Sequence, residues 1–213
     1  GGHVGSDPVV PRLEREALLS GHTGCVNCVS YSKEGGLLVS GSDDRSLMVW
    51  HPLEHSHLAT IETPHTGNIF SAKFMPHSSN RLVVSSAADG RVVVSDISRG
   101  VAIKAGNPTH SGSCYKVRVE ESQPSLILSC GEDGFLQAHD IRAGGEAPKV
   151  LYSARNAKAP PSTGAGDEGG WGSSRKTVCA LDINPVQSHI VSLGGSDGVT
   201  RTLDLRMGSS QLG

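Results

Sequence analysis

Short runs in which apolar and polar residues alternate cover most of the chain, and clusters of Gly, Ser, Asp, Asn and Pro separate these runs. Alternation with a period of two is typical of strands that bury one face, and the polar clusters are typical of tight turns. The first apolar runs are residues 26–31, 37–40, 47–50 and 58–61. The turns between them are residues 33–36, 42–45 and 52–55. The pattern therefore predicts four short antiparallel strands.

The same pattern recurs along the chain. Residues 21–51 are echoed by residues 64–96, 109–140 and 177–204. Each unit carries an aspartate at the same turn position, seven residues before a second anchor. The aspartates are Asp44, Asp89, Asp133 and Asp197, and the second anchors are His51, Asp96, Asp140 and Asp204. Because the first three units recur every 44 or 45 residues, as propeller blades do, the sequence predicts an all-β propeller with about four blades.

The repeat also divides the chain into segments. The step between the third and fourth units is longer by about twenty residues, and residues 156–175 supply them with Gly, Pro and Ser. This composition predicts a flexible insertion inside the propeller rather than a domain boundary. The predicted blades are residues 18–62, 63–106, 107–155 and 176–207, after an N-terminal extension of residues 1–17 and before a tail of residues 208–213.

Composition narrows the partners that we expect. Lys and Arg number 19 against 21 Asp and Glu, a formal net charge of -2. Without a basic excess the chain is a poor candidate for binding a phosphate backbone, and its apolar runs are far shorter than a membrane-spanning helix of about twenty residues. We therefore expect no nucleic acid and no membrane as partner. The five cysteines are an odd number without a secretory leader before them, so we expect buried, reduced thiols and a cytoplasmic and/or nuclear location.

Three short motifs carry a family resemblance. GHTG at residues 21–24, SGSDD at residues 40–44 and VW at residues 49–50, with these spacings, resemble the WD-repeat family. The resemblance implies a hydrogen-bonded network in each blade, from the turn aspartate to a histidine and on to a strand serine and a tryptophan. The first blade has the full set, His22, Ser40, Asp44 and Trp50. The later blades have His65, Ser85 and Asp89, then His110, Ser129 and Asp133, and finally Asp197 alone.

A carboxylate bonded to an imidazole is also the arrangement of a catalytic dyad. Because the pair recurs at one spacing in three units, we favour the structural role, in which buried charges find partners. No phosphate-binding loop, nucleophile elbow or HExxH motif occurs in the chain, so we expect no enzyme and no cofactor. Cys25 and Cys28 lack a second pair of ligands nearby and would point to opposite faces of a strand, so we expect no metal site either.

Two units end in a shared Asp-x-Arg sequence. The residues are Asp140, Ile141 and Arg142 in the third unit and Asp204, Leu205 and Arg206 in the fourth. One interpretation is that the arginine only covers the turn. The alternative rests on a resemblance, since these sequences resemble the WDxR ends of WD-repeat substrate receptors of cullin-4 RING ubiquitin ligases. That resemblance implies that each arginine docks on the ligase adaptor, the damage-specific DNA-binding protein subunit, and its fixed fork of donors suits such a contact.

The resemblance covers about residues 18–207. Over these residues the chain is similar to a group of proteins that combine WD and tetratricopeptide repeats. His139 and Leu203 stand where the WDxR sequence has tryptophan. His51 stands where the first unit would have the aspartate of that sequence. Since WD propellers usually have seven blades, the resemblance implies that four units are an incomplete portion, with the other blades beyond Gly213. It also implies a non-enzymatic scaffold that presents an unidentified protein substrate for ubiquitination. The alternative is a generic WD scaffold or a reader of chromatin or histone tails, although the low aromatic content of 4% offers little for an aromatic cage.

Overall fold

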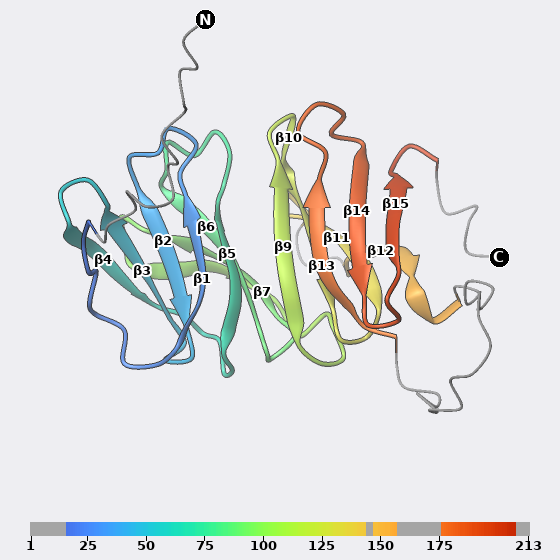
Figure 1. Ribbon diagram of the computed structural model, residues 1–213, viewed down its shortest axis with the longest axis horizontal. Helices are drawn as coiled ribbons and strands as arrows, with labels where there is room; N and C mark the ends of the chain where they lie inside the picture. The colour runs from blue at the N-terminus through green and yellow to red at the C-terminus, as the bar shows by residue number, and fades with distance from the viewer. Residues whose placement is uncertain (1–15, 144–146, 157–175, 208–213) are drawn as a thin grey trace, which may run out of the picture.

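The computed structural model describes residues 16–143, 147–156 and 176–207 (Figure 1). In these residues the regular structure is fifteen β-strands and one short 3-10 turn, η2 (Ala154–Asn156). The strands form three four-stranded sheets and one three-stranded sheet, and within each sheet neighbouring strands are antiparallel and follow chain order. No helix in the described part of the chain is long and apolar enough to cross a membrane. The predicted all-β propeller fold is confirmed.

The first two sheets correspond to the first two sequence units. The first sheet contains β1 (Val26–Tyr31), β2 (Leu38–Ser42), β3 (Ser46–His51) and β4 (Ser56–Glu62). The second contains β5 (Ile69–Phe74), β6 (Leu82–Ala87), β7 (Val92–Asp96) and β8 (Val101–Ala105). The alternation of the first unit predicted β1 to the residue and placed the other strands within two residues of their ends, because turn residues bound each run closely.

The third and fourth sheets follow the same order. The third contains β9 (Cys114–Glu120), β10 (Gln123–Gly131), β11 (Phe135–Asp140) and β12 (Lys149–Ser153). The fourth contains β13 (Val178–Ile183), β14 (Ile190–Gly195) and β15 (Thr200–Asp204). Of the insertion predicted at residues 156–175, all but Asn156 lies outside the described residues, as do the tail and most of the N-terminal extension.

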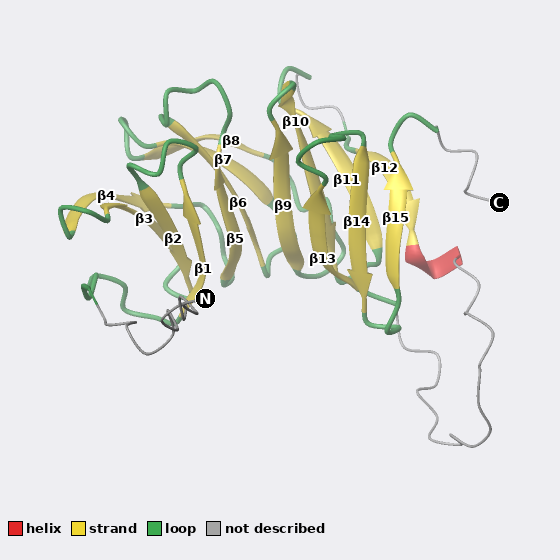
Figure 2. Cartoon of the chain, turned by 45° about the horizontal axis from the view of Figure 1, so that its top comes forward, coloured by secondary structure: helices red, strands yellow, loops and turns green. Residues whose placement is uncertain are grey.

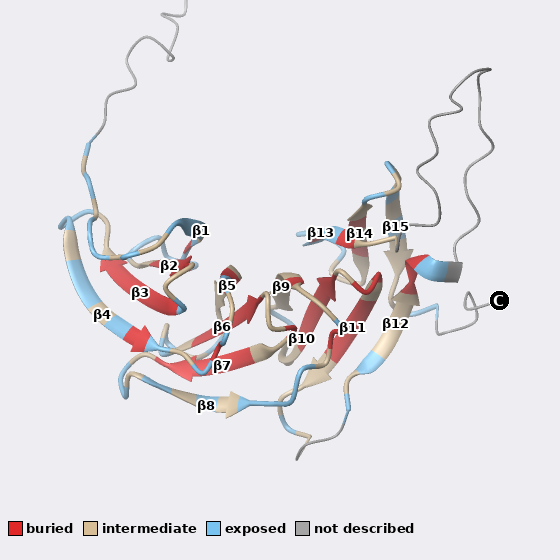
Figure 3. Cartoon of the chain, turned by 90° about the horizontal axis from the view of Figure 1, so that it is seen from below, coloured by how far each residue is buried: buried red, intermediate tan, exposed pale blue. Residues whose placement is uncertain are grey.

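The four sheets stand side by side as an open arc (Figures 2 and 3). Figure 3 shows β1, β5, β9 and β13 along the inner side of the arc and β4, β8 and β12 along the outer side. The first sheet contacts the second, the second contacts the third and the third contacts the fourth, and the ends of the arc are not joined. This is the arrangement of consecutive blades in an incomplete propeller.

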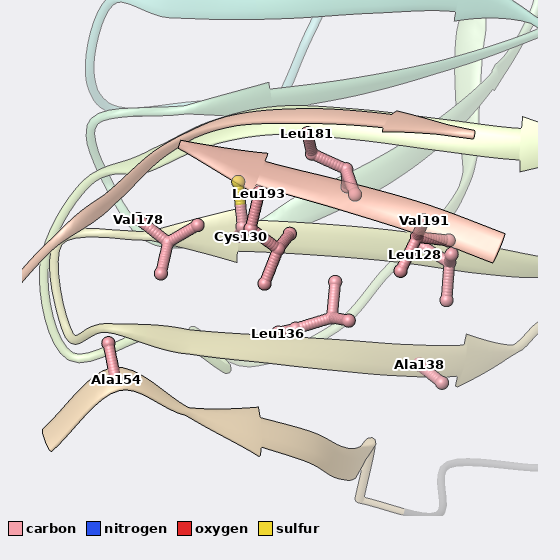
Figure 4. Packing of buried hydrophobic residues seen from close by; sticks show 9 residues of the cluster. All are labelled: Leu128, Cys130, Leu136, Ala138, Ala154, Val178, Leu181, Val191 and Leu193. Atoms are coloured by element: carbon pink, nitrogen blue, oxygen red, sulfur yellow. The ribbon is translucent and has the colours of Figure 1, made fainter. Parts of the chain in front are cut away.

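The hydrophobic core is divided into three layers between successive sheets. Between the first two sheets Val39 and Val49 pack against Ile69 and Val83, all fully buried. The second layer includes Val84, Val94, Val117 and Ile127. The third layer, shown in Figure 4, consists of Leu128, Cys130, Leu136, Ala138, Ala154, Val178, Leu181, Val191 and Leu193. Since burying one Val or Leu side chain contributes about 1.5–3 kcal/mol, these layers hold each blade to the next.

Glycine is required where a turn of one sheet touches the backbone of the next. Gly90 and Gly134 follow the turn aspartates and have φ angles of 73° and 78°. A Cβ on Gly90 would collide with the carbonyl oxygen of His110, and one on Gly134 would collide with that of Lys176. Arg45 holds the same turn position in the first sheet with a φ of 67°, a conformation that L residues adopt at a cost.

The expectation of buried thiols is only partly correct. Cys114 and Cys130 are buried and Cys28 is half-buried, but Cys25 and Cys179 are exposed. The two exposed thiols lie just before β1 and in β13, on the inner side of the arc. An apolar run therefore predicted the strand of Cys179 without showing which side of that strand faces solvent.

Candidate functional site

In the first blade the aspartate, histidine, serine and tryptophan form one continuous network. Nδ1 of His22 lies 2.8 Å from Asp44 Oδ2, and Nε2 of His22 lies 2.7 Å from Ser40 Oγ. The Trp50 indole N–H donates to the same Ser40 oxygen at 2.9 Å. Asp44 also accepts the backbone N–H groups of Thr23 and Ser46, at 3.0 and 2.9 Å. One carboxylate thus fastens the β2–β3 turn to the segment that leads into β1.

The second blade repeats this network without its last member. His65 Nδ1 lies 3.1 Å from Asp89 Oδ1, and His65 Nε2 lies 3.0 Å from Ser85 Oγ. Ser95 takes the tryptophan position, and among the described residues its buried hydroxyl has no hydrogen-bond partner. The network of this blade therefore ends at Ser85.

In the third blade a histidine takes the place of the tryptophan. His110 Nδ1 lies 2.9 Å from Asp133 Oδ1, and His110 Nε2 lies 2.8 Å from Ser129 Oγ. The ring of His139 then lies with Nε2 2.7 Å from the same Ser129 oxygen. Burial, together with the nearby His110 and Lys104, lowers the pKa of His139 to about 4. The sequence placed His139 at this position but did not show that it makes the missing hydrogen bond.

In the fourth blade no histidine precedes the aspartate at the spacing of the other blades, and an arginine binds that aspartate. Arg201 Nη2 lies 2.5 Å from Asp197 Oδ2, and Arg201 Nη1 lies 3.0 Å from Asp197 Oδ1. A Cβ on Gly195 would lie 3.1 Å from Arg201 Nη1, and a Cβ on the equivalent Gly131 would lie 3.1 Å from His110 Nδ1. The guanidinium therefore occupies the place of the imidazole. Sequence reasoning missed Arg201 because it lies after the aspartate, in β15, rather than before it.

The turn carboxylates are held ionised. Burial opposes the charge of Asp44, Asp89 and Asp133, but donated hydrogen bonds outweigh it and lower each pKa. For Asp44 the donors are the Ser46 N–H and hydroxyl, His22 and the Thr23 N–H. For Asp197, the hydrogen bond from Arg201 is the main cause of the lowered pKa. Among the described residues, the donors to these carboxylates are turn and strand groups of the same blade, which fits a structural role.

These aspartates define one edge of the arc, and the candidate arginines define the other. We call the edge formed by the β2–β3 turn and its equivalents the aspartate edge. The opposite edge, which we call the arginine edge, consists of the turns that follow the first and third strands of each sheet. Since strands alternate in direction within each sheet, Arg142 after β11 and Arg206 after β15 both lie on the arginine edge.

Each candidate arginine folds back onto the aspartate of its own turn. Arg142 donates from Nε to Asp140 Oδ1 at 3.1 Å and from Nη2 to Asp140 Oδ2 at 2.7 Å. Arg206 binds Asp204 in the same way, at 3.0 and 2.6 Å. The arginine side chains remain 76% and 67% exposed. These bonds lower the pKa of Asp140 and of Asp204 to about 2.

The geometry of the two turns leaves donors free for a partner. A guanidinium carries five N–H groups, and the fork with the aspartate uses Nε and one N–H of Nη2. Within the described residues, Nη1 and the second N–H of Nη2 make no further hydrogen bond. Exposed ion pairs contribute little to stability. The ion pair between each arginine and its aspartate therefore adds little to the stability of the fold. It does restrict the side chain to one direction, which lowers the entropy that a binding partner must offset.

Lys104 supports the first of these turns from the neighbouring blade. Its ammonium group extends from β8 and donates to the carbonyl oxygens of Ile141 and Ala143 at 2.8 and 2.9 Å. The turn of Arg142 is therefore fixed to the second sheet as well as to its own. Sequence reasoning missed Lys104, since no periodicity links a residue of one unit to a turn of the next.

The first two blades lack an equivalent arginine. The first has Pro52 and Leu53 after His51, and the second has Ser98, whose N–H and hydroxyl bind Asp96 at 2.9 and 2.6 Å. The two candidate arginines are thus on adjacent blades at one end of the arc. In the described part of the chain no group of three or more His, Cys, Asp or Glu residues could hold a metal ion.

Comparison with known proteins gives a consistent picture. The family described as WD domain, G-beta repeat matches residues 13–51. WD and tetratricopeptide repeats protein 1 of Mus musculus is 34% identical over 205 residues, which are 96% of this chain and 28% of that protein. Protein ALTERED SEED GERMINATION 2 of Arabidopsis thaliana is 33% identical over 93% of this chain and 28% of its own length.

A third relative has a name that describes an assembly. DDB1- and CUL4-associated factor 6 of Mus musculus is 30% identical over 207 residues, which are 96% of this chain and 22% of that protein. The human protein of that name is 29% identical over the same share of the chain. The chain spans about a quarter of the length of the relatives that it matches.

Proposed function

This chain is a WD-repeat domain, and on that premise we propose that it is part of a substrate receptor that docks on the adaptor of a cullin-4 RING ubiquitin ligase. WD-repeat domains are in general protein-interaction scaffolds rather than enzymes. In this proposal Arg142 and Arg206 contact the adaptor, and the opposite rim, the aspartate edge, is left to an unidentified protein substrate. A cytoplasmic or nuclear location is part of the proposal, because the five cysteines are free thiols.

The main support for the proposal is that the two Asp-x-Arg turns have the same geometry. Both arginines are exposed, both lie on the arginine edge of adjacent blades, and both are held by the same two-bond fork. Arginine fixed in this way suits a binding hot spot, since its direction is set before the partner arrives and it stays charged. The likeness to a relative named for its association with DDB1 and CUL4 supports the choice of partner.

The experiment is capture of the adaptor by the intact protein. We compare the wild type with the double variant Arg142→Ala, Arg206→Ala, after thermal melting has verified that both fold. A matched control is Arg45→Ala, which removes an equally charged, exposed arginine from the aspartate edge. We expect capture by the wild type and the control, and loss of capture by the double variant at an unchanged melting temperature.

Two outcomes would contradict the proposal in different ways. If the wild type does not capture the adaptor, the ligase role is wrong and the protein remains a WD-repeat scaffold of another assembly. If the double variant still captures the adaptor, the role stands and the assignment to the two arginines is wrong.

A further inference from the structure

The second blade brings an arginine to its anchor aspartate from a neighbouring strand. Arg81 immediately precedes β6, and its carbonyl oxygen accepts the backbone N–H of Ile97 at 2.8 Å. In the two Asp-x-Arg turns the same backbone bond runs from Ile141 at 2.9 Å and from Leu205 at 2.8 Å. The turn after β7 is therefore closed in the same way, although no arginine stands two residues after Asp96.

The guanidinium of Arg81 lies beside the carboxylate of Asp96. The distance from Arg81 Nε to Asp96 Oδ2 is 3.5 Å, and Arg99 Nε lies 3.9 Å from the same oxygen. The Arg81 side chain is 62% exposed, close to the values of Arg142 and Arg206. Exposed guanidinium groups beside an anchor aspartate therefore stand on the arginine edge of three consecutive blades.

The fold does not need Arg81 to satisfy Asp96. Asp96 Oδ1 accepts the N–H and the hydroxyl of Ser98 at 2.9 and 2.6 Å and the N–H of Arg99 at 3.3 Å, so its own turn holds this carboxylate. Within the described residues the Arg81 guanidinium donates no hydrogen bond, and an exposed ion pair contributes little to stability. Its N–H groups are therefore available to a partner.

A groove of about 700 Å³ lies beside Arg81 on the arginine edge, between the first and second sheets. Its apolar surface comes from Leu37, Leu58, Ala59 and Ile97. The turns around it add hydroxyl and amide groups, and Arg81 is the one charged side chain among the described residues that line it. An arginine beside an apolar hollow is typical of the hot spots of protein interfaces.

The turn that carries Arg81 is held in place before any partner binds. Ser79 and Asn80, directly before Arg81, have φ angles of 51° and 58°, a conformation that L residues adopt at a cost. The side-chain amide of Asn80 donates to Glu34 Oε2 at 3.1 Å, which links this turn to the turn after β1 in the first sheet. A fixed turn lowers the entropy that binding must offset.

We propose that the second blade also docks on the ligase adaptor, and that its groove receives an adaptor segment in which an apolar side chain stands next to an oxygen acceptor. The apolar side chain packs against Leu58, and the acceptor binds the Arg81 guanidinium. Continuity selects this occupant, because Arg81 lies on the same edge as Arg142 and in the adjacent blade. The inference rests on the proposed function and extends its contact from two blades to three.

The experiment measures the affinity of the intact protein for the purified adaptor by surface plasmon resonance. We compare the wild type with Arg81→Ala and with Leu58→Ser. The control for the first variant is Arg45→Ala, which removes an exposed arginine from the aspartate edge. The control for the second is Ile103→Ser. Ile103 and Leu58 are both 48% exposed and occupy corresponding bulges of the outer strands β8 and β4, but Ile103 does not line the groove.

We expect Arg81→Ala and Leu58→Ser each to weaken the affinity by about tenfold. Both controls should bind as the wild type does, and all four variants should melt at the wild-type temperature. If the wild type binds and Arg81→Ala loses no more than Arg45→Ala, or Leu58→Ser no more than Ile103→Ser, the inference is overturned and the proposed function stands. A wild type that does not bind the adaptor would overturn both.

A measurement on the wild type keeps the inference testable if a variant does not fold. Phenylglyoxal modifies exposed guanidinium groups, and mass spectrometry reports the extent at each arginine. The adaptor should protect Arg81 and leave Arg45 reactive. Equal modification of Arg81 in the free protein and in its complex with the adaptor would contradict the contact.

Discussion

The His139 imidazole holds Ser129 at 2.7 Å in the third blade, in the way that the Trp50 indole holds Ser40 at 2.9 Å in the first. The hydrogen bonds that run from Asp133 through His110 and Ser129 to His139 determine which nitrogen of His139 carries the proton. In the neutral tautomer of His110 that donates from Nδ1 to Asp133, Nε2 of that ring accepts the hydroxyl proton of Ser129. The Ser129 oxygen is then an acceptor, so His139 must carry its proton on Nε2. A histidine in this tautomer reproduces the donor of an indole.

We predict that His139 makes the stability of the protein depend on pH. Its folded pKa of about 4 is below the ordinary value of 6.5, so the unfolded chain binds the extra proton first as pH falls. Its contribution to the free energy of unfolding is therefore constant above pH 6.5 and declines from there to about pH 4. Relative to neutral pH, the decline amounts to about 2 kcal/mol by pH 5.

The comparison for this prediction is His139→Gln, which keeps an N–H donor of similar reach but does not titrate. Urea unfolding at several pH values between 5 and 8 gives the free energy of both proteins. The wild type should lose about 2 kcal/mol more than His139→Gln between pH 7 and pH 5. Parallel curves would show that burial does not suppress the protonation of His139.

The sequence predicted the features that repeat and missed contacts that occur in one blade only. The strands and turn aspartates were predictable because one spacing recurs, and Asp44 lies seven residues before His51 as Asp89 lies before Asp96. Lys104 was not predictable, because it acts on a turn more than thirty residues away in the next blade. Arg201 was missed because it reaches the aspartate from the opposite side in sequence. Long side chains that cross between strands follow no period.

We predict that Asp44→Ala destabilises the protein by about 2–4 kcal/mol. The substitution removes the acceptor of His22, Thr23 and Ser46 and leaves their donors unpaired at the aspartate edge. Urea unfolding measures the loss. The matched control is Asp43→Ala, whose carboxylate binds the exposed Asn27 amide, and it should cost less than about 1 kcal/mol. Similar losses for the two variants would mean that the network of the first blade is not a main source of stability.

We predict that Lys104→Met loosens the turn that presents Arg142. Three carbonyl oxygens of that turn lie within 3.5 Å of the ammonium group, and methionine fills the space without a donor. The expected cost is about 1–2 kcal/mol of unfolding free energy, with faster amide exchange at residues 141–143. Lys149→Met serves as the control and should change neither. Unchanged exchange in Lys104→Met would show that the turn is held by its own sheet alone.

We predict that arginine cannot be replaced by lysine at the two Asp-x-Arg turns. Arg142→Lys, Arg206→Lys keeps both charges but loses the two-bond fork with Asp140 and Asp204 and the outward donors beside it. Adaptor capture should fall by about tenfold or more, while the melting temperature stays unchanged because both sites are exposed. Full capture by the lysine variant would show that charge alone makes the contact.

The fourth blade permits a direct measurement of how strongly an arginine replaces the missing histidine. Arg201 and Asp197 are only 13% and 15% exposed as side chains, so removing one partner leaves the other charge poorly solvated. Arg201→Met and Asp197→Ala should each cost about 2–4 kcal/mol in urea unfolding, and the double variant should cost less than their sum by about 1–3 kcal/mol. Strictly additive losses would mean that the two charges do not interact in solution. In that case the Val199 N–H, 3.3 Å from Asp197, would remain as the donor that holds the turn of the fourth blade. The size of the coupling therefore tests whether the guanidinium performs the role that His22, His65 and His110 have in the other blades.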